Sequence, residues 1–144
     1  MAIRTARTAW NGTLMEGSGQ VELTSSGVGT FDVSFPRRTA EKAQGTSPEE
    51  LIAAAHSSCY SMALSGEIAA AGGDPIALEV TADVTLTPDP AGGLHISLIH
   101  LTVRGEVEGL DAAGFEAAAQ AAKVGCPVSK ALAATTITLD ASLA

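Results

Sequence analysis

The pattern of apolar and polar residues is most regular between residues 46 and 71, TSPEELIAAAHSSCYSMALSGEIAAA. Ser47 can cap a helix through its hydroxyl, and Pro48 fits the first turn, where its missing N–H costs nothing. Gly72 and Gly73 end the run. Between these limits, apolar residues recur at helical spacing on a face rich in small side chains: Leu51, Ile52, Ala55, Cys59, Met62 and Ala63. We therefore predict a buried central helix that another backbone can approach closely.

Strand-like patterns precede this helix. Residues 2–10, 20–24 and 29–35 are predicted to be strands, because apolar and polar residues alternate in them and turn-forming Asn and Gly residues separate them. In the third strand, the apolar residues of GTFDVSF share one face. The three strands predict an antiparallel meander. A polar loop that begins with PRR at residues 36–38 is expected to connect the meander to the central helix.

Further strands and helices follow the central helix. Residues 77–87 alternate and residues 88–93 have the composition of a hairpin turn, so residues 94–107 should return as a long strand. On that strand we expect one face to carry Ile96, Leu98, His100 and Thr102. The remaining predicted elements are a helix over 112–124 capped by Asp111, a short helix over 128–133 opened by Cys126-Pro127, and a strand over 135–142. The order predicts an α+β fold in one domain, residues 1–144, with helices on one face of a mainly antiparallel sheet.

Composition narrows the classes of partner. The formal net charge is −8 and the isoelectric point is about 4.7, which argues against nucleic acid or an anionic membrane as a partner. No stretch approaches the roughly 20 apolar residues of a membrane span. We therefore expect a cytoplasmic protein, in which two cysteines are reduced thiols by default and a disulfide is more often catalytic than structural.

The two cysteines are the main candidates for chemistry. Each could be a small buried hydrophobic residue. A zinc site from Cys59, His56 and Cys126 would lack an evident fourth ligand, so no metal and no cofactor are predicted. A hydrolase is disfavoured because His56 lies one turn from Cys59 on the same helix. Cys126 precedes a short helix, whose N-terminus lowers a thiol pKa, whereas Cys59 lies in mid-helix; local physics therefore makes Cys126 the more acidic thiol.

Two motifs resemble a known family. GTSPEELIAAAHSSCYSMALS, followed by KVGCPVSKAL, closely resembles the OsmC/Ohr family of thiol peroxidases, and the OsmC branch more than the Ohr branch. The resemblance implies an intertwined α+β homodimer that reduces organic hydroperoxides, with hydrogen peroxide reduced less well in the Ohr branch. It makes Cys59 the peroxidatic cysteine and Cys126 the resolving one. It also implies a catalytic glutamate, which is Glu49, and an arginine, for which Arg38 fits the pattern better than Arg37. We further assign substrate binding to Arg37 and Met62.

The implied mechanism is physically consistent. A Cys59 thiolate would cleave the peroxide and become a sulfenic acid, and Cys126 would condense with it to a disulfide that an external dithiol, such as a lipoyl protein, must reduce. Arg38, held by Glu49, would supply the cation. Glu49 and Cys59 are about 15 Å apart along one helix, so either the helix start is kinked or Arg38 and Glu49 of one protomer serve Cys59 of another. The alternative function is a non-catalytic, stress-associated binding dimer whose cysteines are merely buried.

Overall fold

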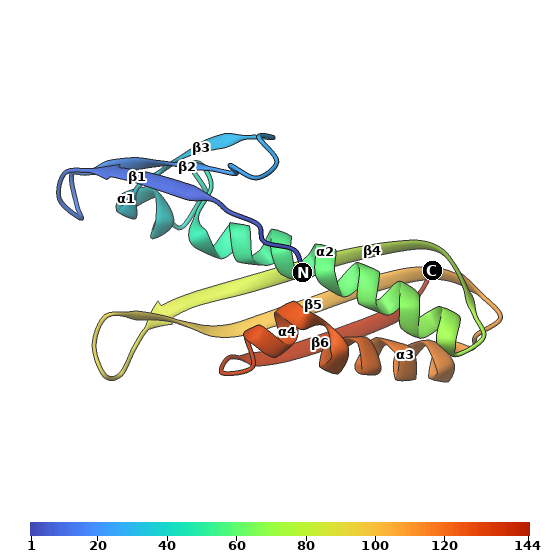
Figure 1. The fold of residues 1–144 in the computed structure, drawn as a ribbon. Coiled ribbons are helices and arrows are strands. Elements are labelled where there is room, and N and C mark those ends of the chain that lie inside the picture. Colours follow the sequence, from blue (N-terminus) through green and yellow to red (C-terminus); the bar gives the residue numbers. More distant parts are fainter. The chain divides into compact units, whose positions relative to one another are not determined.

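A computed structural model describes residues 1–144, and the chain forms two compact units, Met1–Leu51 and Ile52–Ala144 (Figure 1). The α+β fold class is confirmed, because both units combine strands with helices. The strands form two three-stranded sheets, β1-β2-β3 and β4-β5-β6, where the sequence suggested one. The single domain over residues 1–144 stays a prediction.

The first unit contains the predicted meander. Its strands are β1 (Arg7–Asn11), β2 (Ser18–Glu22) and β3 (Thr30–Val33), and both pairings are antiparallel. The first strand begins at Arg7 instead of residue 2. Trp10 of β1 pairs with Gly19 of β2, and a Cβ atom at Gly19 or Gly17 would lie 2.9 Å from the indole ring. These two glycines therefore let the indole lie close against the backbone.

The predicted loop at residues 36–38 is wrong. Residues Phe35–Arg38 form a short helix, α1, instead. Ser34 is extended and its hydroxyl accepts a hydrogen bond from the N–H of Arg37 at 3.4 Å, while Pro36 occupies the first turn. A capping serine followed by a first-turn proline is a helix start. Phe35 consequently belongs to this helix and does not share the strand face of Phe31 and Val33.

The long helix α2 (Pro48–Ala70) is confirmed. The Ser47 hydroxyl accepts from the N–H of Glu50 at 3.1 Å, and the chain leaves the helix through Gly72, which has φ +87°. The apolar face predicted for this helix is right in part, because Ile52, Cys59 and Ala63 pack against the core, and wrong for Ala55 and Met62, which are exposed. The fully buried stripe is His56, Tyr60, Leu64 and Ile68. It begins with a histidine, which an apolar pattern does not select.

The second unit is built on the sheet β4 (Asp74–Pro88), β5 (Leu94–Glu108) and β6 (Thr136–Leu143). Strands β4 and β5 form the predicted hairpin, and β6 joins β5 in parallel after the helices α3 (Ala112–Gly125) and α4 (Pro127–Ala131). Asp111 caps α3 by accepting from the N–H of Gly114 at 2.8 Å, as predicted. One core unites the second-unit part of α2 with β5 and α3, so the helices cover one face of the sheet.

The predicted face of β5 is right for Leu98, His100 and Thr102, which alternate with the buried residues, and wrong for Ile96, which packs against the core. The buried residues are Ile99, Leu101 and Val103. The pairing shifts between Thr85–Leu98 and Leu86–Ile96, so Ser97 is an extra residue on β5. This bulge reverses the alternation of the faces along the strand.

None of the helices in the chain has the length and apolar character needed to cross a bilayer.

Candidate active site

The second unit brings the two cysteines together. Cys59, in the middle of α2, and Cys126, between α3 and α4, are both free thiols, and their Sγ atoms are 3.0 Å apart. A disulfide bond is about 2.05 Å long, so the two sulfurs could join after a movement of about 1 Å. Cys59 is partly exposed, whereas Cys126 is completely buried. A reagent from solvent therefore has access to Cys59 and not to Cys126.

The surroundings of the two thiols differ. Burial alone would raise the pKa of Cys126, but hydrogen bonds from the Cys59 thiol, the N–H and hydroxyl of Ser129 and the N–H of Val128 outweigh burial and lower it. Burial raises the pKa of the Cys59 thiol, and the hydrogen bond between Cys59 and Cys126 raises it further. The N–H of Val128 lowers the same pKa, but by less. The prediction that local physics makes Cys126 the more acidic thiol is therefore confirmed.

A buried polar pair lies beside the thiols. His56 of α2 and Ser129 of α4 are 2.7 Å apart, Nε2 to Oγ, and both are buried. Burial lowers the pKa of His56, so the imidazole is neutral. Sequence reasoning considered His56 as a ligand or a base and missed Ser129, although Ser129 sits three positions after Cys126 in GCPVS, where a helical turn returns it to the sulfur. The chain contains no cluster of three or more residues that could hold a metal ion.

The first unit contains a partly buried ion pair. The Nε of Arg38 donates to both carboxylate oxygens of Glu49, at 3.0 and 3.2 Å, and Nη2 donates to Oε1 at 2.6 Å. The Glu49 side chain is 9% exposed and that of Arg38 34%. Two adjacent guanidinium nitrogens on one carboxylate fix the direction of the guanidinium group, as expected for a forked arginine–carboxylate pair.

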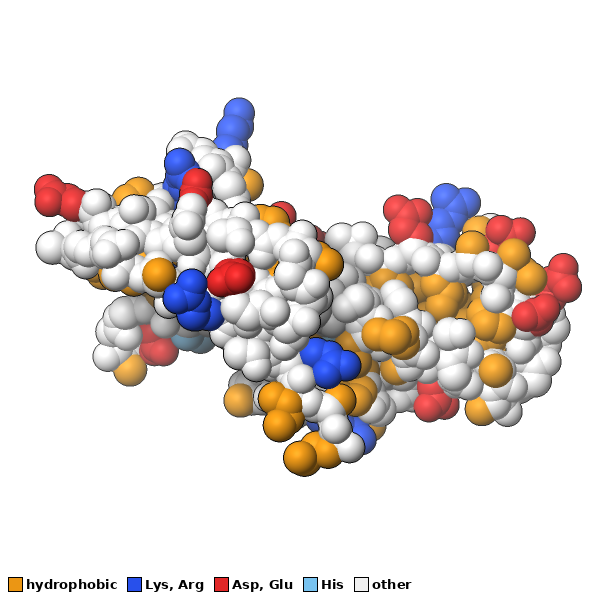
Figure 2. Space-filling view, turned by 45° about the horizontal axis from the view of Figure 1, so that its top comes forward, with side chains coloured by type: hydrophobic (Ala, Val, Ile, Leu, Met, Phe, Trp, Pro, Cys, Tyr) orange, Lys and Arg blue, Asp and Glu red, His pale blue; other side chains and the backbone are white.

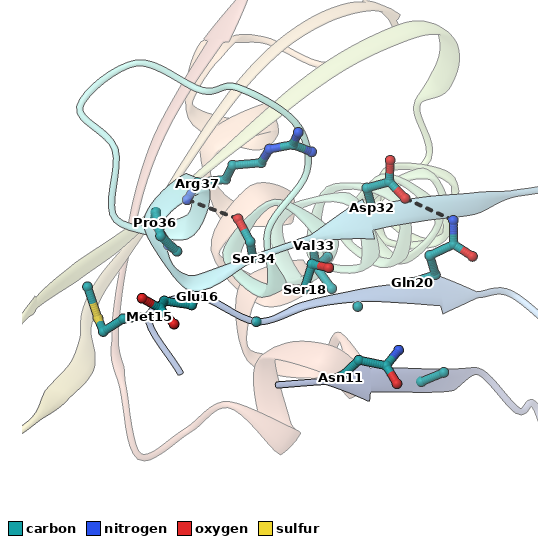
Figure 3. Close-up of a pocket in the computed structure, with 13 residues that line it drawn as sticks. Asn11, Met15, Glu16, Ser18, Gln20, Asp32, Val33, Ser34, Pro36 and Arg37 are labelled. Carbon is teal, nitrogen blue, oxygen red and sulfur yellow. Dashed lines mark hydrogen bonds between the residues drawn. The ribbon is translucent and has the colours of Figure 1, made fainter. Parts of the chain in front are cut away.

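Arg37 and Arg38 face different cavities of the first unit, because successive residues on a helix are turned by about 100°. Arg38 borders a cavity of about 430 Å³ whose lining is mostly apolar and includes Trp10, Leu14 and Phe35. Arg37 borders a polar cavity of about 610 Å³ together with Asp32 and other polar residues (Figure 3). Every residue that lines either of the two cavities belongs to the first unit.

The predicted site residues thus fall into two groups. Cys59 and Cys126 lie together in the second unit, and Arg38 and Glu49 lie together in the first. Arg37 is not paired with Glu49; its backbone N–H bonds to Ser34. Met62, assigned to substrate binding, is 70% exposed on α2.

The chain is similar to proteins of one family. The family model described as OsmC-like protein matches residues 41–141. Peroxiredoxin OsmC of Escherichia coli (strain K12) is 43% identical over 134 residues, which are 93% of this chain and 92% of that protein. Organic hydroperoxide resistance protein OhrA of Bacillus subtilis (strain 168) is 34% identical over 111 residues, covering 76% of this chain and 77% of that protein. The crystal structure of OhrB of Bacillus subtilis matches with a TM-score of 0.75 and 28% identity, covering 96% and 98% of the two chains.

Proposed function

Because the chain belongs to the OsmC-like family, we propose that it is a thiol-dependent peroxidase that reduces organic hydroperoxides to alcohols. The observation that carries the proposal is the pair of free thiols with Sγ atoms 3.0 Å apart, one partly exposed and one buried. The names of the relatives from Escherichia coli and Bacillus subtilis support the same reaction class. The family match crosses the limit between the two units, which supports residues 1–144 as one OsmC-like domain.

In the proposed reaction, the Cys59 thiolate attacks one peroxide oxygen. The O–O bond breaks, the alcohol leaves after taking up a proton, and Cys59 becomes a sulfenic acid. Cys126 then attacks the Cys59 sulfur and forms a disulfide with loss of water. An external dithiol, such as a lipoyl protein or another thiol, returns both cysteines to thiols. The exposure of Cys59 and the burial of Cys126 support this division of roles, because the peroxide arrives from solvent.

Arg38 is the cation that we propose for activating Cys59. The groups that set the pKa of Cys59 include no positive charge, so the thiolate lacks the partner that it needs. Arg38 has its guanidinium direction fixed by Glu49, which fits a group that stabilises a thiolate and the developing oxyanion. Arg37 and Met62 remain proposed contributors to substrate binding. The mostly apolar cavity beside Arg38 supports alkyl or aryl hydroperoxides as substrates.

We further propose an intertwined homodimer in which Arg38 and Glu49 of one protomer serve Cys59 of its partner. Glu49 and Cys59 are ten positions apart in a helix, about 15 Å by helical rise, which is a long reach for one arginine. Large apolar side chains are also exposed in both units; they include Trp10, Leu14, Met62, Ile76 and Val124. Figure 2 shows orange hydrophobic groups on one face of the surface. Exposed apolar surface of this kind favours a second protein surface. The cytoplasmic location stays part of the proposal.

The test is a count of free thiols after one equivalent of cumene hydroperoxide, in the wild type, Cys59→Ser and Cys126→Ser. We expect rapid loss of both thiols in the wild type, none in Cys59→Ser, and a trapped sulfenic acid in Cys126→Ser. Oxidation of Cys126 in the absence of Cys59 would reverse the two roles. If both thiols persist in the wild type, the peroxidase function is wrong and a binding dimer with buried cysteines takes its place.

A further inference from the structure

The buried pair of His56 and Ser129 has no part in the reaction proposed above. The two side chains come from α2 and α4, 73 positions apart, and meet at 2.7 Å inside the core of the second unit. A polar pair in a core is unfavourable unless its hydrogen bonds are made, and an apolar pair of the same size would pack there without that requirement. The pair therefore calls for a functional explanation.

The hydrogen bond between them has a preferred direction. His56 is neutral, because burial lowers its pKa, so only one ring nitrogen carries a hydrogen. Its Nδ1 is buried without a partner. A hydrogen on Nδ1 would be an unpaired buried donor, and such donors are rare in proteins. We assign the hydrogen to Nε2, which then donates to the Ser129 oxygen.

This direction leaves the hydrogen of the Ser129 hydroxyl free to donate. Ser129 follows Cys126 by three positions, so the first turn of α4 returns its side chain toward the sulfur, and its hydroxyl is among the groups that lower the pKa of that thiol. A thiolate can only accept hydrogen bonds. The three groups thus form a chain in which every hydrogen points the same way, from His56 Nε2 to Ser129 Oγ and from Ser129 Oγ to Cys126 Sγ.

We propose that His56 and Ser129 are positioning residues for the resolving step, in which His56 orients the Ser129 hydroxyl as a hydrogen-bond donor to the attacking sulfur of Cys126. The proposal rests on the proposed function for the identity of that step. In the resolving step, the S–S bond forms between Cys126 and the sulfur of the Cys59 sulfenic acid while the S–O bond of the sulfenic acid breaks. The departing hydroxide takes up a proton and becomes water. Oxidation of Cys126 is balanced by reduction of the sulfenic acid.

Other titratable groups near Cys126 do not obscure a measurement of its pKa. The two titratable groups that interact with it, Cys59 and Tyr60, both lie on α2. Burial raises the pKa of Tyr60, whose hydroxyl donates to the carbonyl of Ala119, so this phenol stays protonated. Cys59→Ser removes the second thiol and makes Cys126 the only cysteine of the chain.

The experiment is a titration of the ultraviolet thiolate absorbance of Cys126 in the Cys59→Ser background. We expect Ser129→Ala to raise the Cys126 pKa by about one unit, the size of a hydrogen bond to a charged group. His56→Leu should raise it by less, and Ser129→Thr, which keeps the hydroxyl, should restore it. Once Ser129 is alanine, His56→Leu should add nothing, because His56 acts only through that hydroxyl.

A second measurement follows the reaction in chains that keep Cys59. After one equivalent of cumene hydroperoxide, Ser129→Ala should slow disulfide formation by about tenfold, which corresponds to a barrier about 1.4 kcal/mol higher, and leave sulfenic acid formation unchanged. The matched control is His100→Leu. His100 also meets a hydroxyl at 2.7 Å, that of Thr138, but this pair lies on the sheet outside the buried core. It should change neither quantity.

An unchanged Cys126 pKa in folded Ser129→Ala and His56→Leu overturns the proposal. If Ser129→Ala does not fold, His56→Leu alone decides. The titration needs no peroxide, so it separates the two hypotheses. A wild type that ignores peroxide but shows the expected shifts would disprove the peroxidase function and keep the hydrogen-bond chain.

Discussion

The two units of the chain contain different halves of the proposed chemistry. The first has an arginine held by a buried glutamate next to an apolar cavity, and it has no cysteine. The second has both thiols, and only burial and hydrogen bonds set their pKa values. Neutral hydrogen-bond donors lower the pKa of buried Cys126, but burial leaves the accessible Cys59 with a raised pKa. Cys59, the proposed nucleophile, therefore needs a positive charge, and the groups that set its pKa in its own unit include none.

The largest expected effect comes from removing that charge. Arg38→Met should slow the reaction of Cys59 with cumene hydroperoxide by about a hundredfold, because the thiolate and the developing oxyanion lose their cation. Arg37→Met is the comparison variant: as a proposed contributor to substrate binding it should slow the reaction, but by less than Arg38→Met, because Arg37 borders the other cavity and is not paired with Glu49. Stopped-flow measurement of the single tryptophan or of thiol loss follows the reaction. A larger loss in Arg37→Met would exchange the roles of the two arginines.

A smaller loss is expected when the arginine stays but its support is removed. Glu49→Gln keeps the size of the side chain and one acceptor oxygen, but it no longer offers a charged fork to Arg38. We expect about a tenfold slower reaction with peroxide, with the same sulfenic acid product. The measurement is the second-order rate constant over a series of peroxide concentrations. A faster reaction would mean that Glu49 mainly neutralises the arginine.

The sequence predicted the local elements better than their faces. Helices α2 and α3 were predicted from capping residues next to them, Ser47 and Asp111, and β4 from its alternation. Ile96 was predicted on the wrong face of β5 because the bulge at Ser97 depends on the register with β4, which no local pattern encodes. Helix α1 was missed although Ser34 and Pro36 signal it, because the alternation of the preceding strand was extended too far.

The candidate site was predictable only in part. Cys59 and Cys126 are 67 positions apart, and no spacing rule brings them to 3.0 Å; the family resemblance made that pairing an expectation. The lower pKa of Cys126 followed from its place before a helix. The contact of His56 with Ser129 could not be predicted, because it depends on how α4 packs against α2.

Mixing two inactive variants would sharpen the comparison between units. If Arg38 serves the partner's thiol, a mixed dimer of Arg38→Met and Cys59→Ser regains one intact site from the two chains. Random mixing after unfolding and refolding should then restore about a quarter of the wild-type activity, because half of the dimers are mixed and each has one working site. The two variants refolded separately are the controls. If the mixture stays inactive while mixed dimers are detected by mass spectrometry, each chain uses its own arginine.

The smallest expected effect concerns stability and is specific to the second unit. Burial lowers the pKa of His56 below the 6.5 of an unfolded histidine, so as the pH falls below 6.5 the unfolded chain takes up a proton before the folded one does. The free energy of unfolding should therefore fall with decreasing pH until the folded pKa is passed, by about 1.4 kcal/mol for each unit of difference. Urea unfolding in the Cys126→Ser background measures this without titration of the Cys126 thiol, and His56→Leu should flatten the profile. If His56→Leu leaves the profile unchanged, the acid sensitivity lies elsewhere, and the burial of His56 has no energetic consequence.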